Sequence, residues 1–431
     1  MAGRSKGDAR AAAKPTPRVL ILAATTAYQT GDLVAAAEEL GVEPLLATDR
    51  CHVLADMWPE GAMPLDFGEP DGAARDIAER FRGESRRLAA VIPTDERTAR
   101  VAACASRNLG LPHNPPGAAA AAGDKLRFRR AMSFAGLPHP PFSPLRAGDD
   151  PGPAAAAIGY PVVIKPLHLS ASRGVMRADG PAELAARAHR LVRLLSDADV
   201  AGREPEAAAR YLVERYVPGD EVAFEGLLRG GRLEELAIFD KPEPLEGPFF
   251  AETIYVTPSR RAPDETSAIR GAVSAACAAI GLREGPVHAE IRLSHAGPMV
   301  LELASRSIGG LCGRTLRYGA GISVEQAVLV HAVGRDPRAL MREAAPAAGV
   351  MMLPVPEAGV LREVDGEAEA AAVPGVAEVT ITARPGDRLL PLPEGNAYLG
   401  FIFATGSDPD AVSTSLRTAR SALTPRVAAQ L

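Results

Sequence analysis

The residues best suited to chemistry lie in two short runs, VHAEIRL and VLELA. Successive side chains of an extended strand point to opposite faces, so His288 and Glu290 share one face of the first run. Glu302 and Ala304 likewise share one face of the second run. A five-residue hairpin loop over residues 294–298 then places Glu290 opposite Glu302, and it also places His288 opposite Ala304. Two carboxylates opposite each other repel unless a cation compensates, and carboxylate oxygens suit Mg²⁺ bound together with substrate phosphates. The alternative is that both glutamates face solvent on an outer face of a sheet.

Lysine is rare in this chain, which makes the few lysines informative. Only five of the 48 basic residues are lysines, and two of these lie within the first 14 residues. Lysine is a compact point charge whereas arginine is a planar fork, so a lysine retained against this bias is a candidate for a role that arginine does not fill. Chance retention is the alternative. The lysines in the body of the chain are Lys125, Lys165 and Lys241.

A loop of small residues follows one of these lysines. Lys165 ends the strand-like run YPVVIK, and Ser170-Ala171-Ser172-Arg173-Gly174 comes shortly after it. Small residues with free N–H groups can cradle phosphates, although an ordinary flexible turn has the same composition. Downstream, Arg306 precedes Gly309-Gly310. Arginine can hold phosphate oxygens or an oxyanion bidentately, and glycine lets backbone approach a ligand. Two lysines, this loop, paired carboxylates and an arginine together meet the needs of phosphoryl transfer from a nucleotide.

The elements that must position these residues indicate an α/β protein. Apolar runs at 18–24, 42–49 and 88–96 read as strands, with helical patterns between them. Strands that alternate with helices predict a parallel sheet, whose ligands bind at the carboxyl ends of its strands. Thr94-Asp95-Glu96 lies at such an end, and helix capping is the alternative role for these residues. No G-x-G-x-x-G follows the first run, so a dinucleotide site is not expected. From about residue 345 the chain is rich in strands with one final helix, which predicts a small separate module.

Composition excludes several classes of protein. The 431 residues carry a net charge of −5 and only 4% are aromatic, so the chain lacks the basic excess and the stacking side chains typical of nucleic-acid binders. No apolar run reaches the roughly 18–20 residues of a membrane span, and the N-terminus lacks the apolar stretch of a signal peptide. The four cysteines have neither metal-binding nor redox spacing. We therefore expect reduced thiols and a cytoplasmic location.

The motifs, taken in order, resemble the ATP-grasp superfamily over residues from about 112 to 335. The matching pieces are DK at 124–125, YPVVIKP, the small-residue loop, VERYVPGDE, HAEIRL and LELASRSIGG. Within the superfamily the chain is most similar to carboxylate–amine ligases of the L-amino-acid ligase type, whose small terminal domain resembles GVMMLPVPEAGVLREV and AYLGFIFATG. The resemblance implies an α/β ATP-grasp fold with an N-terminal parallel α/β domain and a small C-terminal α+β module. The expected parts are a disordered tail at 1–16, the N-terminal domain at 17–115, the ATP-grasp domain at 116–340 and the C-terminal domain at 341–431.

The resemblance also implies roles for single residues in binding ATP and metal. Residues expected to bind the nucleotide are Lys125 and Lys165 on the phosphates, the lid Ser170–Val175, the adenine hinge Glu214–Val217 with Tyr216 and Val217, and Glu221 on the ribose. Glu290 and Glu302 are expected to bind one or two Mg²⁺ ions, with Mn²⁺ as an alternative. Arg306 is expected to stabilise an acyl-phosphate and a tetrahedral intermediate, with His288 near the transferred phosphate.

The implied reaction joins a carboxylate, such as that of an amino acid, to an amine. The carboxylate attacks the γ-phosphate of ATP to give an acyl-phosphate and ADP, and the amine then displaces phosphate to form an amide or dipeptide. The alternatives are a kinase of small molecules without an amine acceptor and a nucleotide-binding module without turnover. Small-molecule substrates are the expected partners, without nucleic acid or membrane. The oligomeric state is open, with a homodimer as one alternative.

One residue departs from the family pattern, and one lysine lies outside it. The family reads Glu-x-Asn-x-Arg after the second metal carboxylate, whereas this chain has Ala304 at the asparagine position. A methyl group does not bind a metal, so the second ion is weaker or takes another ligand. Lys241 is not a general landmark of the family. We hypothesise that Lys241, Glu252 and Thr253 meet the substrate, and a surface lysine is the alternative.

Overall fold

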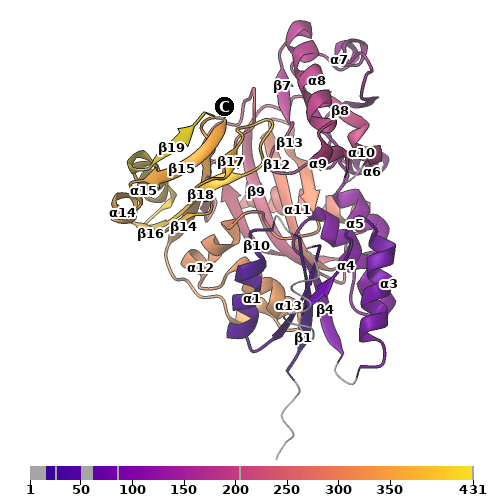
Figure 1. The fold of residues 1–431 in the computed structure, drawn as a ribbon, viewed down its shortest axis with the longest axis vertical. Coiled ribbons are helices and arrows are strands. Elements are labelled where there is room, and N and C mark those ends of the chain that lie inside the picture. The colour runs from indigo at the N-terminus through magenta and orange to yellow at the C-terminus, as the bar shows by residue number, and fades with distance from the viewer. Residues whose placement is uncertain (1–15, 25–26, 50–61, 85–86, 203–204, 430–431) are drawn as a thin grey trace, which may run out of the picture.

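The computed structural model describes residues 16–24, 27–49, 62–84, 87–202 and 205–429. The expected N-terminal tail therefore lies outside the described residues, except for Thr16, and so does Cys51. Figure 1 shows a large sheet at the centre, the N-terminal part at the bottom and lower right, a smaller sheet at the top and the C-terminal part at the left.

The N-terminal part is a parallel sheet of four strands in the order β3-β2-β1-β4. Val19 and Ile21 of β1 pack with the first helix, and Leu20 and Leu22 pack with the other two. Burial on both faces explains the continuous apolar run of β1. Its strands are β1 (Arg18–Ala23), β2 (Glu43–Thr48), β3 (Ala62–Pro64) and β4 (Leu88–Pro93), and its helices are α1 (Thr30–Glu39), α3 (Pro70–Phe81) and α4 (Glu96–Leu109).

Helix α4 begins and ends as its sequence predicts. The Asp95 carboxylate accepts a hydrogen bond from the Thr98 N–H, and Gly110 closes the helix with a φ of +69°. The cap places Asp95 and Glu96 directly after β4, at the carboxyl edge of the parallel sheet.

A small antiparallel sheet, ordered β5-β8-β6-β7, forms the upper end of the view in Figure 1. Two helices, α5 (Pro116–Ala122) and α6 (Lys125–Phe134), lead to it from α4. Three helices lie over residues 181–208, of which the first packs Leu184, Leu191 and Leu194 against the sheet. The elements are β5 (Phe142–Arg146), α7 (Gly152–Ile158), β6 (Val162–Pro166), β7 (Met176–Ala178), α8 (Pro181–Leu195), α9 (Ala198–Ala201), α10 (Pro205–Ala208) and β8 (Arg210–Arg215).

The central sheet has eight strands in the order β13-β12-β9-β10-β11-β14-β18-β16. Helix α11 covers one face through Ile269 and Val273, and helices α13 and α1 lie with Leu227 and Phe239 in the core on the other face. The strands are β9 (Asp220–Arg229), β10 (Arg232–Asp240), β11 (Ile254–Thr257), β12 (Gly285–Ser294), β13 (Gly297–Ala304), β14 (Ala347–Pro354), β16 (Val376–Ile381) and β18 (Tyr398–Gly406), and the helices are α11 (Pro263–Ile280), α12 (Thr315–Ala320) and α13 (Val324–Ala332).

The C-terminal part shares this sheet instead of standing apart from it. Strands β14, β18 and β16 extend the central sheet, because β14 pairs with β11 from Ile254↔Met351 to Thr257↔Ala348. Among the described residues, a three-stranded sheet, ordered β17-β15-β19, lies entirely within this part. The expected C-terminal module is thus joined to the central sheet by strands of its own, and the domain boundaries stay predictions. The remaining elements are β15 (Gly359–Asp365), α14 (Glu367–Ala371), β17 (Arg388–Leu389), α15 (Pro409–Ala422) and β19 (Thr424–Ala428).

Among the residues that the structure describes, no helix combines the length and the apolar character that crossing a membrane requires.

Candidate active site

A cavity of about 840 Å³ opens where all parts of the molecule meet. The N-terminal part contributes Glu96, the small sheet contributes Lys165, the central sheet contributes Glu290, and the C-terminal part contributes Tyr398. Most of the residues singled out from the sequence line this one cavity, although they lie far apart in the chain.

The hairpin of β12 and β13 sets the two expected metal carboxylates side by side. Glu290 pairs with Glu302 and His288 pairs with Ala304, as expected. The turn is tighter than expected, because Ser294 pairs with Gly297. A β-bulge next to Glu290 adds one residue to β13 and so restores the expected register at the glutamates.

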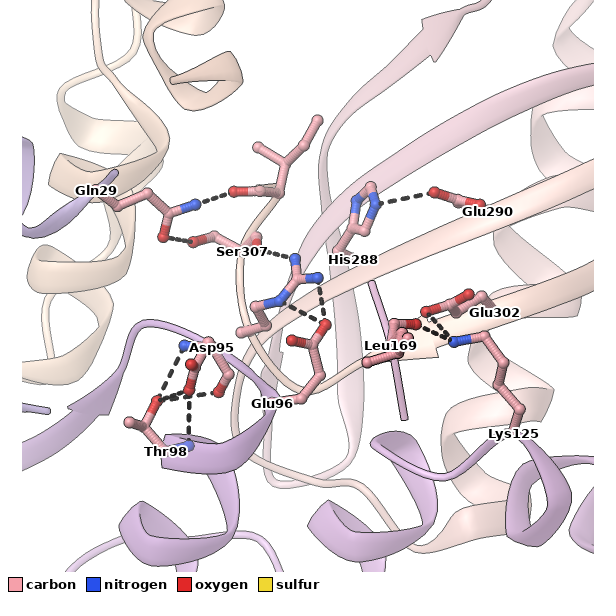
Figure 2. Close-up of polar contacts among 12 residues, drawn as sticks. Gln29, Asp95, Glu96, Thr98, Lys125, Leu169, His288, Glu290, Glu302 and Ser307 are labelled. Atoms are coloured by element: carbon pink, nitrogen blue, oxygen red, sulfur yellow. Dashed lines mark hydrogen bonds and ion pairs between the residues drawn. The ribbon is translucent and has the colours of Figure 1, made fainter. Parts of the chain in front are cut away.

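Lys125 starts helix α6 and reaches the second carboxylate. The Asp124 carboxylate caps the helix by accepting hydrogen bonds from the N–H groups of Leu126 and Arg127. The Lys125 ammonium donates to the Leu169 carbonyl at 2.8 Å and lies 3.3 Å from Glu302 Oε1. Figure 2 shows this contact. The side chain is only 9% exposed, so its charge lies in the cavity wall and is largely shielded from bulk water.

Lys165 lies in a buried chain of charges at the end of β6. Its ammonium pairs with Glu214, whose carboxylate also accepts a hydrogen bond from Arg129 at 3.0 Å. Burial lowers the pKa of Lys165, Glu214 works against this, and Arg129 adds to it. The net result is a pKa of about 8. For Glu214 the charged partners outweigh burial. Burial favours the neutral acid, but the two cations outweigh it and lower the pKa of the carboxyl group.

The expected hinge and lid both line the cavity. The Tyr216 N–H donates to the Pro161 carbonyl at 3.0 Å, and the Tyr216 ring lies parallel to that of Phe250 with centroids 6.4 Å apart. In the lid, Ala171 and Ser172 have φ values of +53° and +55°, so the loop turns sharply after β6. The expected residues that line the cavity here are Ser170, Ser172, Arg173, Glu214, Tyr216 and Val217, whereas Gly174 packs behind them.

Lys241 lies behind three carboxylates and not in the open cavity. Its ammonium is 2.6 Å from Glu221 Oε1, bonds to Glu252, and is 3.8 Å from Glu290 Oε1. Burial disfavours the charged amine, but the three carboxylates outweigh this and raise the pKa of Lys241 well above its usual value. Of the three residues expected to meet the substrate, Glu252 lines the cavity, whereas Lys241 and Thr253 do not. This geometry favours Lys241 as the cation that holds the carboxylates together.

Glu221 is similarly engaged. Besides Lys241 it pairs with Arg292, whose Nε lies 2.8 Å from Glu221 Oε2. Both Glu221 and Arg292 line the cavity, and contact of Glu221 with a ribose stays a prediction.

For three residues of this region, either the residue itself or its partner was not identified from the sequence. Glu225 on β9 is fully buried and lies 2.6 Å from His288 Nδ1. Counting in steps of two from Glu221 would have placed it on the same face. Glu96 pairs with Arg306, with 2.9 Å between Glu96 Oε1 and Arg306 Nε.

The third residue is Gln29, whose side-chain amide donates to the Ile308 carbonyl. In Figure 2, Gln29 and Glu96 approach the strands of His288 and Glu302 from the N-terminal part. No local signal in the sequence indicates contacts across more than 200 residues.

The charges of this group reinforce one another. Burial disfavours the imidazolium of His288, but hydrogen bonds with Glu225 and Glu290 outweigh it and raise the pKa of His288 to about 9. Burial acts in the same way on Arg306, and Glu96 outweighs it, so the pKa of Arg306 is raised. Both groups are therefore cations at neutral pH, and they face a site for anions.

The donors in the cavity fit a hard divalent ion. The carboxylates of Glu290 and Glu302 are partly exposed, at 27% and 33%, and such oxygens are the ligands that Mg²⁺ prefers. Ala304 is buried beside them and offers no donor. A second carboxylate group, formed by Glu221, Glu252 and Glu290, has oxygens within 4.8 Å of one another, but the Lys241 ammonium already lies against all three.

Comparison with known proteins gives matches to two domain families. Residues 158–315 match the ATP-grasp domain, and residues 351–428 match the L-amino acid ligase C-terminal domain 2. The structure of an L-amino acid ligase from Bacillus licheniformis superposes with a TM-score of 0.79 and 24% identity, covering 97% of this chain and 100% of that one. A biotin carboxylase domain dimer from Hydrogenobacter thermophilus, in complex with MgADP, gives a TM-score of 0.64 with 17% identity over 95% of this chain and 90% of that one.

Curated relatives match over shorter stretches. Alanine–anticapsin ligase of Bacillus subtilis (strain 168) is 26% identical over 54% of this chain and 51% of its own length. Carnosine synthase 1 of Gallus gallus is 30% identical over 70% of this chain and 34% of its own length. The chain spans between about one third and two thirds of the length of the first such relatives. The domain and structural matches confirm the predicted fold class and the predicted resemblance.

Proposed function

We propose that this chain is an ATP-dependent carboxylate–amine ligase, because residues 158–315 match the ATP-grasp domain and residues 351–428 match the L-amino acid ligase C-terminal domain 2. It activates a carboxylate, that of an amino acid, as an acyl-phosphate and joins it to an amine. The products are an amide or dipeptide, ADP and phosphate. Two of the relatives named above, the L-amino acid ligase and the alanine–anticapsin ligase, are ligases by their printed names, which favours this function over a kinase without an amine acceptor.

Nucleotide binding is the first proposed role of the cavity residues. Lys125 and Lys165 neutralise the phosphates of ATP, and the loop Ser170–Val175 covers them. The segment Glu214–Val217 contacts the adenine through its backbone, and Glu221 holds the ribose. The burial of both lysines supports this role, because a buried ammonium binds phosphate more strongly than an exposed one.

Metal binding is the second proposed role. Glu290 and Glu302 hold one or two Mg²⁺ ions, with Mn²⁺ as the alternative. A bound ion would neutralise charge that develops on the phosphate oxygens. The paired register of the two glutamates supports at least one ion, and Ala304 makes the second site the weaker one.

The reaction itself needs cations around the transferred phosphoryl group. Arg306 and His288 are positioned to hold its oxygens, since both are charged and both line the cavity. Arg306 also stabilises the oxyanion that forms when the amine attacks the acyl-phosphate. Lys241 acts indirectly, by keeping Glu252 and Glu290 in place against their mutual repulsion.

The observation that carries the proposal is the convergence of Lys125, Lys165, Glu290, Glu302 and Arg306 on one cavity beneath an L-amino acid ligase C-terminal domain. The test is a phosphate-release screen of amino acids, singly and in pairs, with Mg²⁺ and mass detection of products. A ligase forms ADP and an amide only when an amine is present. ADP formation without an amine and with a phosphorylated product would show a kinase, and no Mg²⁺-dependent ADP with any substrate would favour a binding module.

We also propose a cytoplasmic location and a homodimer. Cys104, Cys277 and Cys312 are free and buried, which fits a reducing compartment. The structural relative from Hydrogenobacter thermophilus is a dimer, and light scattering of the purified chain tests whether this one is.

A further inference from the structure

The loop Ser170–Val175 contacts a segment far along the chain. The Gly174 N–H donates to the Pro393 carbonyl at 2.9 Å, and Arg173 Nε donates to the Glu394 carbonyl at 2.7 Å. The Glu394 carboxylate accepts two hydrogen bonds from Arg190 of α8, at 2.5 and 2.7 Å. The loop and the helix behind it are thus both tied to one turn of the C-terminal part, 391–396.

That turn has a fixed shape. The Gly395 N–H donates to the Pro391 carbonyl at 3.0 Å, and a Cβ added at Gly395 would lie 1.7 Å from the Leu390 carbonyl oxygen. Only glycine fits there. The far end of the turn enters the cavity, where Asn396 and Tyr398 form part of the wall. One segment therefore has its first half on the lid and its second half in the cavity wall.

A second segment of the central part repeats this arrangement. Phe249 forms a β-bridge with Met176, the first residue of β7, and the guanidinium of Arg190 lies 5.2 Å from the centre of the Phe249 ring. The neighbouring residues Phe250 and Glu252 line the cavity. Arg190 thus contacts both segments, through an ion pair with Glu394 and a cation–π contact with Phe249.

We propose that Glu394 is a positioning residue that holds the Ser170–Val175 loop closed over the nucleotide phosphates, through Arg190 and Arg173, and so links closure to the state of the substrate side of the cavity. The proposal rests on the ligase function proposed above. A closed loop excludes water from an acyl-phosphate, so that the amine and not water receives the acyl group. The guanidinium of Arg190 lowers the pKa of Glu394, which keeps the pair charged at neutral pH.

The test compares Glu394→Gln with a control, Asp365→Asn. Glutamine keeps the size of the side chain and the backbone carbonyl that receives Arg173, but it loses the charge that binds Arg190. Asp365 also forms an arginine pair in the C-terminal part, 2.5 Å from Arg426, yet it does not line the cavity. Three quantities are measured: amide hydrogen exchange of residues 169–177, the Kd of a non-hydrolysable ATP analogue, and the ratio of phosphate released to amide formed.

We expect Glu394→Gln to speed exchange in residues 169–177 while leaving the remaining segments unchanged. We expect it to raise the Kd of the analogue about five-fold, the range of a partly exposed ion pair, and to raise the ratio of phosphate to amide. Asp365→Asn should do none of these. The double variant Arg190→Met/Glu394→Gln should be no worse than Arg190→Met alone, because the Glu394 carboxylate acts through Arg190.

Equal loop exchange and equal nucleotide affinity in Glu394→Gln and Asp365→Asn would overturn the proposal. Additive losses in the double variant would also overturn it. Failure of the ligase function is a separate outcome. In that case no substrate pair gives an amide with the unmodified protein, while loop exchange and analogue binding still decide the role of Glu394.

Discussion

Binding of ATP should weaken above about pH 8 because Lys165 loses its proton there. Burial lowers the pKa of Lys165 to about 8, and only the protonated amine attracts phosphate. The affinity of the free protein for an ATP analogue should therefore change no more than about twofold between pH 7 and 8. It should then fall about tenfold per pH unit, as for any ligand that needs one protonated group.

Two substitutions should move the pH limit, the pH above which ATP binding weakens, in opposite directions. Glu214→Gln removes the carboxylate that supports the ammonium, and two unit charges at 4 Å interact by about 4 kcal/mol at an effective dielectric constant of 20. That is about 3 pKa units as an upper bound, so we expect the limit to fall by at least one unit, to pH 7 or lower. Arg129→Met removes a cation that lowers the pKa of Lys165, so the limit should rise.

Calorimetric titration of a non-hydrolysable ATP analogue between pH 6.5 and 10 measures the limit without any need for turnover. Glu214→Gln leaves two buried cations without their carboxylate, and Arg129→Met removes one of the two cations that pair with Glu214. Breaking a buried ion pair costs on the order of 3–5 kcal/mol of stability, so thermal melting of each variant at each pH is the control. Loss of folding alone would move both limits in the same direction. An affinity that stays constant to pH 9.5 in the unmodified protein, or limits that move together, would refute the assignment of Lys165.

Four further substitutions test other parts of the site and the core. Glu302→Ala should lower kcat/KM at least a hundredfold at ordinary Mg²⁺, since it removes one of two paired metal carboxylates, and an unchanged value would disprove the metal assignment. Ala304→Asn should lower the Mg²⁺ concentration for half-maximal activity by supplying an amide oxygen, and an unchanged Mg²⁺ titration would show that this position takes no part. Lys241→Met should alter KM or kcat for the carboxylate substrate, because Glu252 and Glu290 lose the cation beside them, and unchanged values of both would remove its role. Glu325→Gln should raise Tm by a few degrees at pH 8 and by less at pH 5. Burial raises the pKa of Glu325 to about 7, so the native state loses stability as the pH rises from about 4.5 to 7, by about 3 kcal/mol in total, and equal Tm differences at both pH values would contradict this.

The sequence predicts well what local patterns determine. Strand β1 follows from a continuous apolar run. The ends of α4 follow from Asp95 at its N-cap and Gly110 at its C-cap. The predicted pairing of Glu290 with Glu302 is confirmed, but the loop from which it was predicted differs in the structure. A five-residue loop gives that register, but the chain reaches it with a tighter turn and a bulge, and alternation alone does not reveal a bulge.

Partners from distant elements could not be predicted. The contacts of Arg306 with Glu96 and of Arg190 with Glu394 join residues 210 and 204 positions apart, and each depends on how separate elements pack. Lys241 is instructive for the same reason. The sequence identifies it as a retained cation near the site, but only the fold shows that three carboxylates separate it from the cavity.

The continuous central sheet limits how relatives of this chain can be recombined. Strand β11 pairs with β10 at a single position, Asp240↔Val256, but with β14 at four. The strand that directly follows Glu252 is thus anchored chiefly by residues beyond 340. A chain cut at that point would present β11 as a bare edge, open to association with other chains. Chimeras that exchange specificity between such proteins should therefore transfer β11 together with β14, so that the exchanged segments keep their hydrogen-bonded strand pair.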